Sequence, residues 1–150
     1  MFGQLLFGSR FHAIRQSRGQ QGIGITGVVM YCQLTTGRTT HVRSKIATEP
    51  TAAVVDIGLD TRKNKATKAN AGREMWYNED GSSKEHGTEV TAQMKAKYQK
   101  GRQSVWQYLR MTSIVNPHAE IIFIDPDGEK HHWTRVTERL PTKVESIKPH

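Results

Sequence analysis

The amino-acid sequence predicts an α+β fold in which helices cover one face of a mostly antiparallel sheet. Several short segments alternate polar and apolar residues, which is the pattern of a strand with one buried face. Two longer segments are apolar at helical spacing instead. Because strands and helices come in runs rather than in regular alternation, the order of elements favours α+β over α/β. The length of 150 residues suits about one domain.

The first half of the chain is predicted to hold one buried helix followed by strands. Apolar residues cover much of the surface of Ile25–Leu34, and Gly37 stands where a helix C-cap favours glycine. Glu49-Pro50 is expected to turn the chain between two strands. The predicted elements are, in order, the end of a helix at residues 1–7, a loop at 8–18, a helix at 25–34, strands at 39–48 and 52–57, and an exposed loop at 61–72.

The second half is predicted to hold strands, one amphipathic helix and a hairpin. Asn116-Pro117 should end the helix, because proline disfavours the helical conformation in the residue before it. Asp125–Gly128 is typical of a tight turn. The predicted elements are a strand at 75–77, a polar turn at 78–84, a strand at 88–95, a helix at 101–113, strands at 119–124 and 130–136, and an extended segment from 139.

The composition limits the class of protein. Apolar residues make up 35% of the chain, which is low for a self-sufficient core and fits either a well-solvated domain or part of a larger one. No apolar run is long enough to cross a membrane, and the N-terminus lacks the pattern of a signal peptide. The single cysteine, Cys32, excludes an internal disulfide and a cysteine-based zinc site. A reducing, cytoplasmic location is therefore expected.

Positive charge gathers in the first third of the chain. The net charge of +8 and the isoelectric point of about 9.8 favour polyanionic partners, either nucleic acid or nucleotide phosphate. No acidic residue precedes Glu49, whereas several basic residues do. These are Arg10, Arg15, Arg18, Arg38, Arg43 and Lys45. A solvated basic face would give the same pattern, but here the cluster surrounds a glycine-rich loop.

That loop, Gly19–Gly24, is the feature that carries chemistry. It runs directly into the predicted helix, whose first backbone N–H groups lack helical partners and lie at the positive end of the helix dipole. Phosphate binds readily at such a helix start, and glycines let the backbone approach an anion closely. Thr26 offers a hydroxyl donor, and Arg10, Arg15 and Arg18 supply charge from the preceding segment.

Glycines before a helix often serve packing alone, so the loop by itself leaves that alternative open. Two common phosphate-binding loops are excluded. The loop has no Gly-Lys-Ser/Thr ending, so it is not a P-loop. No predicted strand precedes it within a βαβ unit, so it is not a dinucleotide-binding fingerprint.

Several longer strings, in the right order, decide how the loop is interpreted. The strings are Phe2–His12 with Arg15–Ile25, Tyr31–Gly37, His86–Thr88, Tyr108–Thr112 with Asn116–Ile121, and Ile147–His150. Together they resemble the ATP-binding domain of topoisomerase VI B subunits over nearly the whole chain. They match, in turn, its ATP lid, the helix after the lid, a short His-Gly-Thr strand start, the last helix and strand, and the stretch that leads into the next domain.

The resemblance implies an incomplete Bergerat-type (GHKL) ATP-binding two-layer sandwich spanning residues 1–150, with ATP and magnesium as cofactors of the complete protein. In that family the lid wraps the triphosphate. Arg10 stands where lysine is common, which keeps the charge but replaces a point donor with a planar fork. The phosphate-binding positions, carried over one by one, are Ser9, Arg10, Gly19, Gln20, Gln21, Gly22, Ile23, Gly24, Ile25 and Thr26.

The family's remaining functional parts find no match in this sequence. These are the glutamate that activates water, the asparagine that holds magnesium, the aspartate that reads adenine, the helix–two-turns–helix module and the transducer domain. The chain is therefore expected to be an internal fragment of such a topoisomerase component, without ATPase activity and without catalytic residues of its own. The implied partners are the A subunit, a second B subunit that dimerises with ATP, and double-stranded DNA. In the complete enzyme they relax supercoils by duplex passage.

A second hypothesis is a small basic α+β module that binds nucleic acid without using ATP. Only the charge favours it. The basic segment Arg62–Arg73 is expected to be solvated, with a DNA-facing role as its alternative. Three tryptophans offer stacking surfaces for bases, but their spacing fits packing better. They are Trp76, Trp106 and Trp133.

Two further groups are candidates for a catalytic or metal site. Asp125 and Asp127 lie near His131-His132, but adjacent histidines on a strand point to opposite faces, so no metal site is expected. The two aspartates are more simply turn formers. Glu85-His86 would make an acid–base pair, but it lies in a loop ahead of a strand.

Overall fold

The computed structural model describes residues 23–63 and 65–142. By contact density the chain divides into two compact units, one ending at Lys95 and the other beginning at Ala96. Each unit combines helix and antiparallel strands, so the α+β prediction is confirmed and is consistent with a partial GHKL-type domain. The described strands form two sheets, one in each unit.

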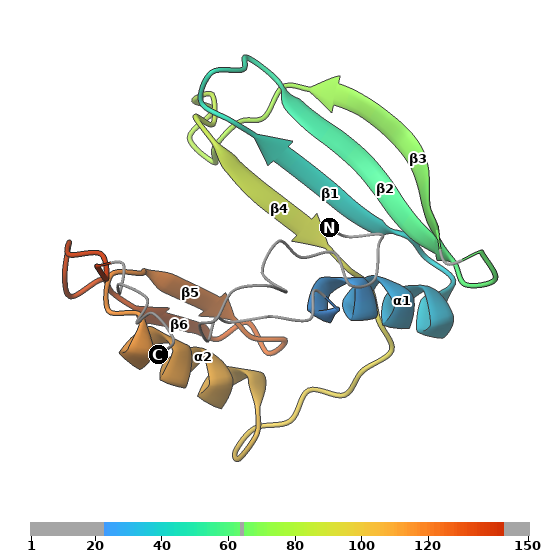
Figure 1. Cartoon of the computed structure of the whole chain (residues 1–150). Helices are drawn as coiled ribbons and strands as arrows, with labels where there is room; N and C mark the ends of the chain where they lie inside the picture. The colour runs from blue at the N-terminus through green and yellow to red at the C-terminus, as the bar shows by residue number, and fades with distance from the viewer. Residues whose placement is uncertain (1–22, 64, 143–150) are drawn as a thin grey trace, which may run out of the picture. The chain divides into compact units, whose positions relative to one another are not determined.

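The first unit is a four-stranded antiparallel sheet with one helix (Figure 1). The strand order is β3-β2-β1-β4, and α1 packs against β2 and β1. A small apolar cluster joins helix and sheet through Val29, Val42, Ile57 and Leu59. The elements are α1 at Gly24–Thr36, β1 at Thr40–Lys45, β2 at Ala52–Asp60, β3 at Lys65–Glu74 and β4 at Gly87–Thr91.

Helix α1 confirms the predicted buried helix and its glycine stop. Gly37 has a φ of 70°, in the left-handed region that favours glycine, and its N–H donates to the carbonyl of Gln33. Val29 and Cys32 on the helix are fully buried. The helix extends two residues beyond the predicted Leu34, because the chain stays helical until the left-handed Gly37.

Strand β3 corrects the prediction of an exposed loop over residues 61–72. The chain pairs with β2 from Lys65 to Glu74, yet all ten residues of the strand are exposed. An edge strand with both faces in solvent needs no apolar side of its own, so its sequence shows no alternation. A bulge interrupts the pairing opposite Val54 and Asp56, and Asn70 takes a left-handed φ of 49° there.

The segment 75–77, predicted as a strand, is not one. Trp76 is buried instead and contacts two cations, with the guanidinium of Arg43 at 4.7 Å and the ammonium of Lys84 at 5.3 Å from the centroid of its ring. Among the described residues, a single bridge between Tyr77 and Ser83 links the chain across the following turn. That turn, residues 78–84, is confirmed, and Gly81 has a φ of 81° within it.

The second unit pairs one helix with a β-hairpin. Helix α2, Val105–Val115, packs against β5, Ile121–Ile124, which pairs with β6, Lys130–Trp133. The helix begins later than the predicted residue 101, because Gly101 and Gln103 have positive φ and Ser104 caps the first turn. Neither described helix has the length and apolar character needed to cross a bilayer.

Candidate functional site

The start of α1 is the described part of the predicted phosphate site. Of the ten predicted residues, Ile23, Gly24, Ile25 and Thr26 are described. The other six, Ser9, Arg10, Gly19, Gln20, Gln21 and Gly22, lie outside the described residues. The helix begins at Gly24, so the glycine string leads directly into a helix N-terminus, as the sequence predicted.

The first turn of α1 is suited to an anion. The N-cap residue, Ile23, makes no side-chain capping bond, and no acidic residue stands in the first turn. The first intrahelical bond runs from the N–H of Gly27 to the carbonyl of Ile23, so the N–H groups of Gly24 and Ile25 precede the helical ladder. A Cβ at Gly24 would meet no described atom within 4 Å, and Gly24 is exposed. Thr26, by contrast, is fully buried.

A side-chain clamp fixes α1 to the sheet. The Gln33 amide donates to the carbonyl of Leu59 at 2.7 Å, and its oxygen accepts from the N–H of Leu59 at 2.7 Å. Strand β1 pairs with β2 only as far as Ile57, so Gln33 takes the place of the missing neighbour beyond that point. This contact anchors the helix to β2, and the orientation of the N-terminus of α1 therefore depends on it.

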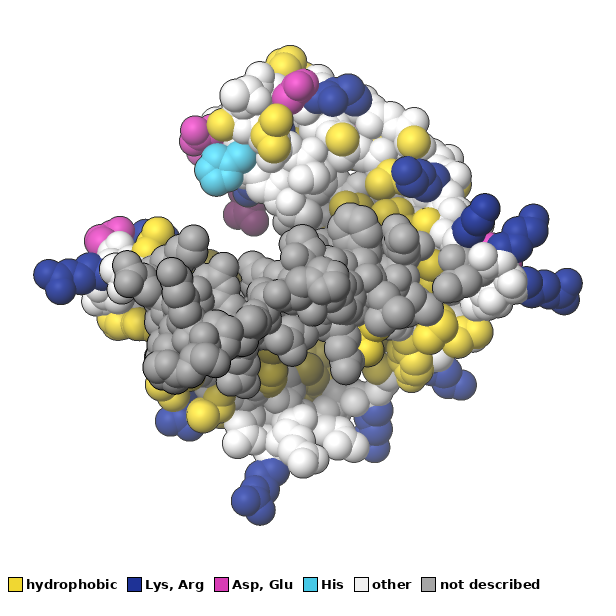
Figure 2. Space-filling model, viewed as in Figure 1, with side chains coloured by type: hydrophobic (Ala, Val, Ile, Leu, Met, Phe, Trp, Pro, Cys, Tyr) yellow, Lys and Arg dark blue, Asp and Glu magenta, His cyan; other side chains and the backbone are white. Residues whose placement is uncertain are grey.

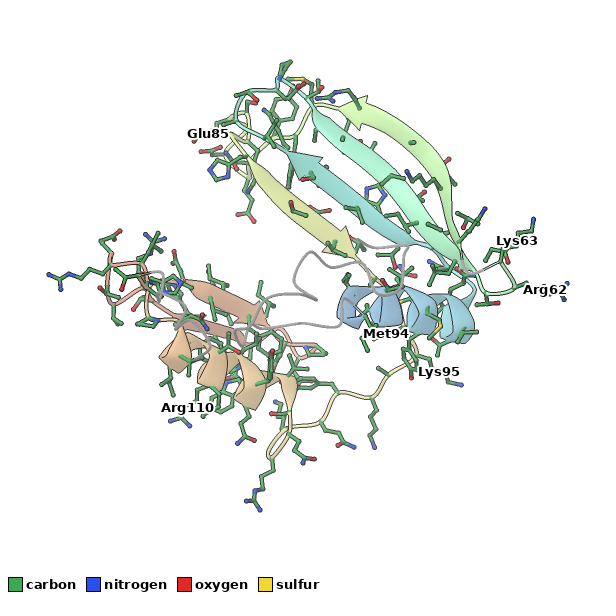
Figure 3. The ribbon with its side chains drawn as sticks, in the orientation of Figure 1. Arg62, Lys63, Glu85, Met94, Lys95 and Arg110 are labelled. Atoms are coloured by element: carbon green, nitrogen blue, oxygen red, sulfur yellow. The ribbon has the colours of Figure 1, made fainter. Side chains whose placement is uncertain are left out.

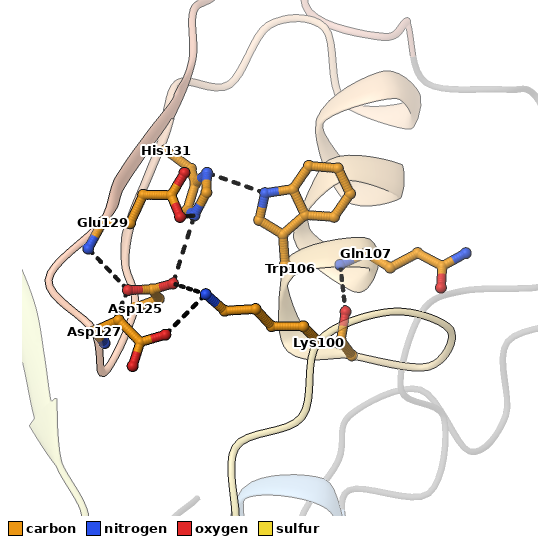
Figure 4. A network of polar contacts seen from close by, with 8 residues as sticks. Lys100, Trp106, Gln107, Asp125, Asp127, Glu129 and His131 are labelled. Atoms are coloured by element: carbon orange, nitrogen blue, oxygen red, sulfur yellow. Dashed lines mark hydrogen bonds and ion pairs between the residues drawn. The ribbon is translucent and has the colours of Figure 1, made fainter.

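A second cluster of polar residues lies on the hairpin of the other unit. Asp125, Glu129 and His131 each offer a ligand atom, and these atoms lie within 4.8 Å of one another. Figure 4 shows the cluster beside Trp106 and Lys100. The sequence suggests Asp125 and His131 as neighbours, but it gives no reason to include Glu129. The hairpin brings Glu129 in, because the Glu129 N–H donates to the Asp125 carboxylate and the Glu129 carbonyl accepts from the Asp125 N–H.

The adjacent histidines of β6 separate as predicted. His132 makes an ion pair of 2.6 Å with Glu120, whereas His131 faces Trp106 and Asp125. Asp127 also stays outside the cluster, since its carboxylate pairs with the Lys100 ammonium at 2.8 Å. A metal site made of both aspartates and both histidines is therefore not formed.

Asp125 is the buried centre of this cluster. Burial acts to raise the pKa of its carboxyl, but the backbone N–H groups of Glu129 and Asp127, with the Lys100 ammonium and the nearby His131 ring, outweigh burial and hold that pKa below its ordinary value. Asp125 is therefore a carboxylate at neutral pH. Its side chain is 1% exposed, while that of Lys100 is 60% exposed.

Three further candidates from the sequence, Glu85, His86 and Trp76, belong to neither site. Glu85 and His86 are exposed in the segment before β4, and Figure 3 labels Glu85 there. Trp76 is buried and its ring contacts Arg43 and Lys84, which supports packing rather than base stacking for this residue.

Basic residues occupy the turn between β2 and β3. Arg62 and Lys63 project from it, and their N–H groups both donate to the Asp60 carboxylate at 3.0 Å (Figure 3). In the space-filling view, many Lys and Arg side chains project into solvent (Figure 2). The turn is therefore well formed by its own aspartate, and its cations remain directed to solvent.

Comparison with known proteins places the chain in a family. No family model matches it. Among curated proteins, it is 47% identical over 151 residues to the type 2 DNA topoisomerase 6 B subunit of Archaeoglobus fulgidus, 44% to that of Methanosarcina acetivorans and 40% to that of Thermococcus gammatolerans. Each match covers 100% of this chain but only 24%, 23% and 26% of the relative. The chain thus spans about a quarter of the length of these relatives, and it belongs to the family of type 2 DNA topoisomerase 6 B subunits.

Proposed function

We propose that this chain is the nucleotide-binding portion of the B subunit of an ATP-dependent type IIB DNA topoisomerase, and that it binds ATP phosphates at the start of α1. One observation carries the proposal. A glycine string leads into a helix whose N-cap offers no side-chain acceptor and whose first turn has no carboxylate to repel an anion. The A subunit, a second B subunit and duplex DNA are the partners of the proposed complete enzyme.

The proposed chemistry is phosphate binding without hydrolysis by this chain alone. The resemblance assigns none of these 150 residues to water activation, magnesium binding or adenine recognition. The described first turn would supply backbone donors from Gly24 and Ile25, and the preceding glycines and Arg10 would complete the lid. The residues present fit a phosphate, because no described atom lies within 4 Å of a Cβ built at Gly24 and because the segment before Gly24 is basic. ATP hydrolysis, which needs bound magnesium, would take place only in the complete protein.

The proposal is tested by amide chemical-shift titration of the 150-residue chain with ATP, GTP and tripolyphosphate. We expect shifts at residues 19–26, with an affinity near the millimolar range, about 4 kcal/mol, because only phosphate contacts are made. At these residues ATP and GTP should bind alike. Gly22→Val should weaken binding by restricting the backbone where it meets the phosphate. Arg10→Ala should weaken it less, and mainly at low salt.

Gly72→Val is the matched control for the lid variant. Gly72 lies in the exposed strand β3, where a Cβ would make only an ordinary contact of 3.8 Å with Val54. It should leave the titration unchanged. Shifts that cluster away from residues 19–26, or a strong preference for ATP over tripolyphosphate at those residues, would contradict the proposal.

A basic nucleic-acid-binding module remains the second candidate, and the β2–β3 turn favours it. Within the described ranges, no ion pair engages Arg62 or Lys63. If duplex DNA competes with tripolyphosphate for residues 19–26, both ligands bind at the lid. If DNA binding is instead lost only in the double variant Arg62→Ala, Lys63→Ala, DNA binds at the β2–β3 turn, independently of the lid. The strong salt dependence expected of phosphate contacts gives the second readout.

A further inference from the structure

The second unit contains a cavity of about 410 Å³ beside the hairpin cluster. This volume lies in the range of small-ligand pockets. Two aromatic side chains, Tyr98 and Trp106, form part of its wall. Three acid–base groups share the wall, namely Asp125, Glu129 and His131, and every lining residue comes from the second unit. The cavity is therefore a pocket of that unit by itself.

Asp125 presents an unfilled hydrogen-bond acceptor at this wall. One carboxylate oxygen, Oδ1, accepts from the N–H of Asp127 at 3.0 Å and of Glu129 at 2.8 Å. The other, Oδ2, is buried and accepts no hydrogen bond from any described residue. Its ion-pair contacts, Nζ of Lys100 and Nε2 of His131, both lie at 3.8 Å, beyond hydrogen-bonding distance. A buried charged oxygen without a hydrogen bond is costly, so a donor from a ligand would be strongly favoured there.

Trp106 determines which nitrogen of His131 carries the proton. The indole nitrogen can only donate, and it lies 3.1 Å from Nδ1 of His131 (Figure 4). Nδ1 must therefore accept, and the neutral ring carries its hydrogen on Nε2. Nε2 faces Asp125 Oδ2 at 3.8 Å and Glu129 Oε2 at 3.9 Å. Within the cluster of Asp125, Glu129 and His131, the wall thus presents one donor, His131, beside two carboxylate acceptors.

The same contact argues against a metal ion at the cluster. Coordination through Nε2 would move the ring proton to Nδ1, where it would oppose the indole N–H of Trp106. Histidines that bind metals normally donate their second N–H to an acceptor, which is the reverse of this arrangement. The cluster is therefore better suited to a ligand that both accepts and donates hydrogen bonds.

We propose that this pocket binds the guanine base of a nucleotide. The edge of guanine offers one acceptor, O6, and two donors, N1–H and the N2 amino group, which complements one donor and two acceptors. O6 would accept from His131, and N1–H and N2–H would donate to Asp125 and Glu129. Tyr98 and Trp106 offer apolar contact to a planar ring. Lys100, Arg102 and Arg110 line the same pocket and favour a ligand that carries phosphate.

The match predicts an order among the bases. Adenine offers one donor and one acceptor at the corresponding edge and leaves one carboxylate without a partner. Uracil offers a single donor between two acceptors, so one of its oxygens would oppose a carboxylate. GMP should therefore bind about tenfold more tightly than AMP, as expected for one hydrogen bond to a charged group, and UMP should bind more weakly still.

The test is a chemical-shift titration of the 150-residue chain with GMP, AMP and UMP, followed at the Trp106 indole N–H and the Gly128 amide. Trp106→Phe assigns the indole signal. Asp125→Asn is the decisive variant, because its amide keeps the Oδ1 acceptor of the turn and replaces the Oδ2 acceptor with a donor. It should weaken GMP binding at least about tenfold, the loss expected for one charge-assisted hydrogen bond. Asp80→Asn, the same change at an exposed turn in the first unit, should leave binding unchanged.

The outcomes separate this proposal from the lid proposal. GMP shifts confined to residues 19–26 and unaffected by Asp125→Asn would overturn the pocket and support the lid. Equal binding of the three nucleotides at Trp106 would overturn base recognition. Zinc that shifts the His131 ring signals at equimolar concentration would overturn the proton assignment on which the proposal rests. A guanine-containing oligonucleotide that binds through the same residues, with the same loss in Asp125→Asn, would support the base contact and identify a polymer as its source.

Discussion

Replacing Gln33 by methionine should destabilise the first unit more than any exposed substitution in it. The side chain of Gln33 is the partner of both backbone groups of Leu59, each at 2.7 Å, and Leu59 is buried. Methionine has a similar length and shape but makes neither hydrogen bond. The N–H and carbonyl of Leu59 would then be left without partners at the point where β1 no longer pairs with β2.

The expected loss follows from these two groups. A buried polar group left without a partner costs about 1–3 kcal/mol, so two such groups give roughly 2–4 kcal/mol after partial access by water. With a urea dependence of about 1–2 kcal/mol per molar, the midpoint of unfolding should fall by about 2 M. Because small domains are stable by only about 5–15 kcal/mol, this is a large fraction of the total.

The assay is urea unfolding followed by circular dichroism, together with hydrogen exchange of the Leu59 amide. Gln93→Met is the matched control, because the Gln93 side chain pairs with the exposed guanidinium of Arg38 at 2.6 Å. Its midpoint should change by less than a third of the shift in Gln33→Met. An unchanged midpoint in Gln33→Met, with the Leu59 amide still protected from exchange, would refute the reasoning.

Gln33→Glu gives a second test in case the methionine variant does not fold. One carboxylate oxygen can still accept from the Leu59 N–H, but the other then faces the Leu59 carbonyl. Only the protonated acid restores a donor, so folding should raise the pKa of the introduced Glu. The variant should therefore be more stable, relative to the parent, at pH 4 than at pH 7. A stability difference between Gln33→Glu and the parent that does not change with pH would count against the contact between Gln33 and Leu59.

Two further predictions concern the same sheet. Gly58→Ala should destabilise the unit by about 1–3 kcal/mol in urea unfolding, because the added Cβ would lie 2.7 Å from Thr67 Oγ1 and 2.9 Å from Gln33 Oε1. Gly72→Ala is the control and should be nearly neutral, because its Cβ would have its nearest contact at 3.8 Å. Equal destabilisation by the two variants would contradict the steric argument. Asp56→Asn should cost about 1–2 kcal/mol at pH 7, because Asn70 and His41 donate to the Asp56 carboxylate and hold its pKa below the ordinary value of 3.8. Because that stabilisation is present above the unfolded pKa and is lost as pH falls through the lowered folded pKa, the stability difference between variant and parent should begin to narrow once the pH falls below about 4. A difference that is as large at pH 3 as at pH 7 would disprove the assignment.

The sequence predicted those elements whose pattern records a buried face. Ile25–Leu34 forms a helix as predicted, because its apolar residues must pack on the sheet, and Gly37 ends it by reaching the left-handed region. The hairpin at Asp125–Gly128 was likewise predicted, since its turn residues act locally. Strand β3 was missed because an edge strand exposed on both faces leaves no periodicity in the sequence.

The start of helix α1 was predictable because glycine content and helix initiation are properties of neighbouring residues. The partners of Gln33 and Asp125 were not, because they depend on contacts between residues far apart in the chain. No pattern in the sequence indicates that a glutamine on α1 takes the place of a strand beside Leu59, or that Trp106 holds the proton of His131 on Nε2. The sequence alone therefore determined the family resemblance, the element types with a buried face and the place of the glycine loop. Only the tertiary structure decided which polar groups meet, because hydrogen-bond partners are set by the packing of elements rather than by their order.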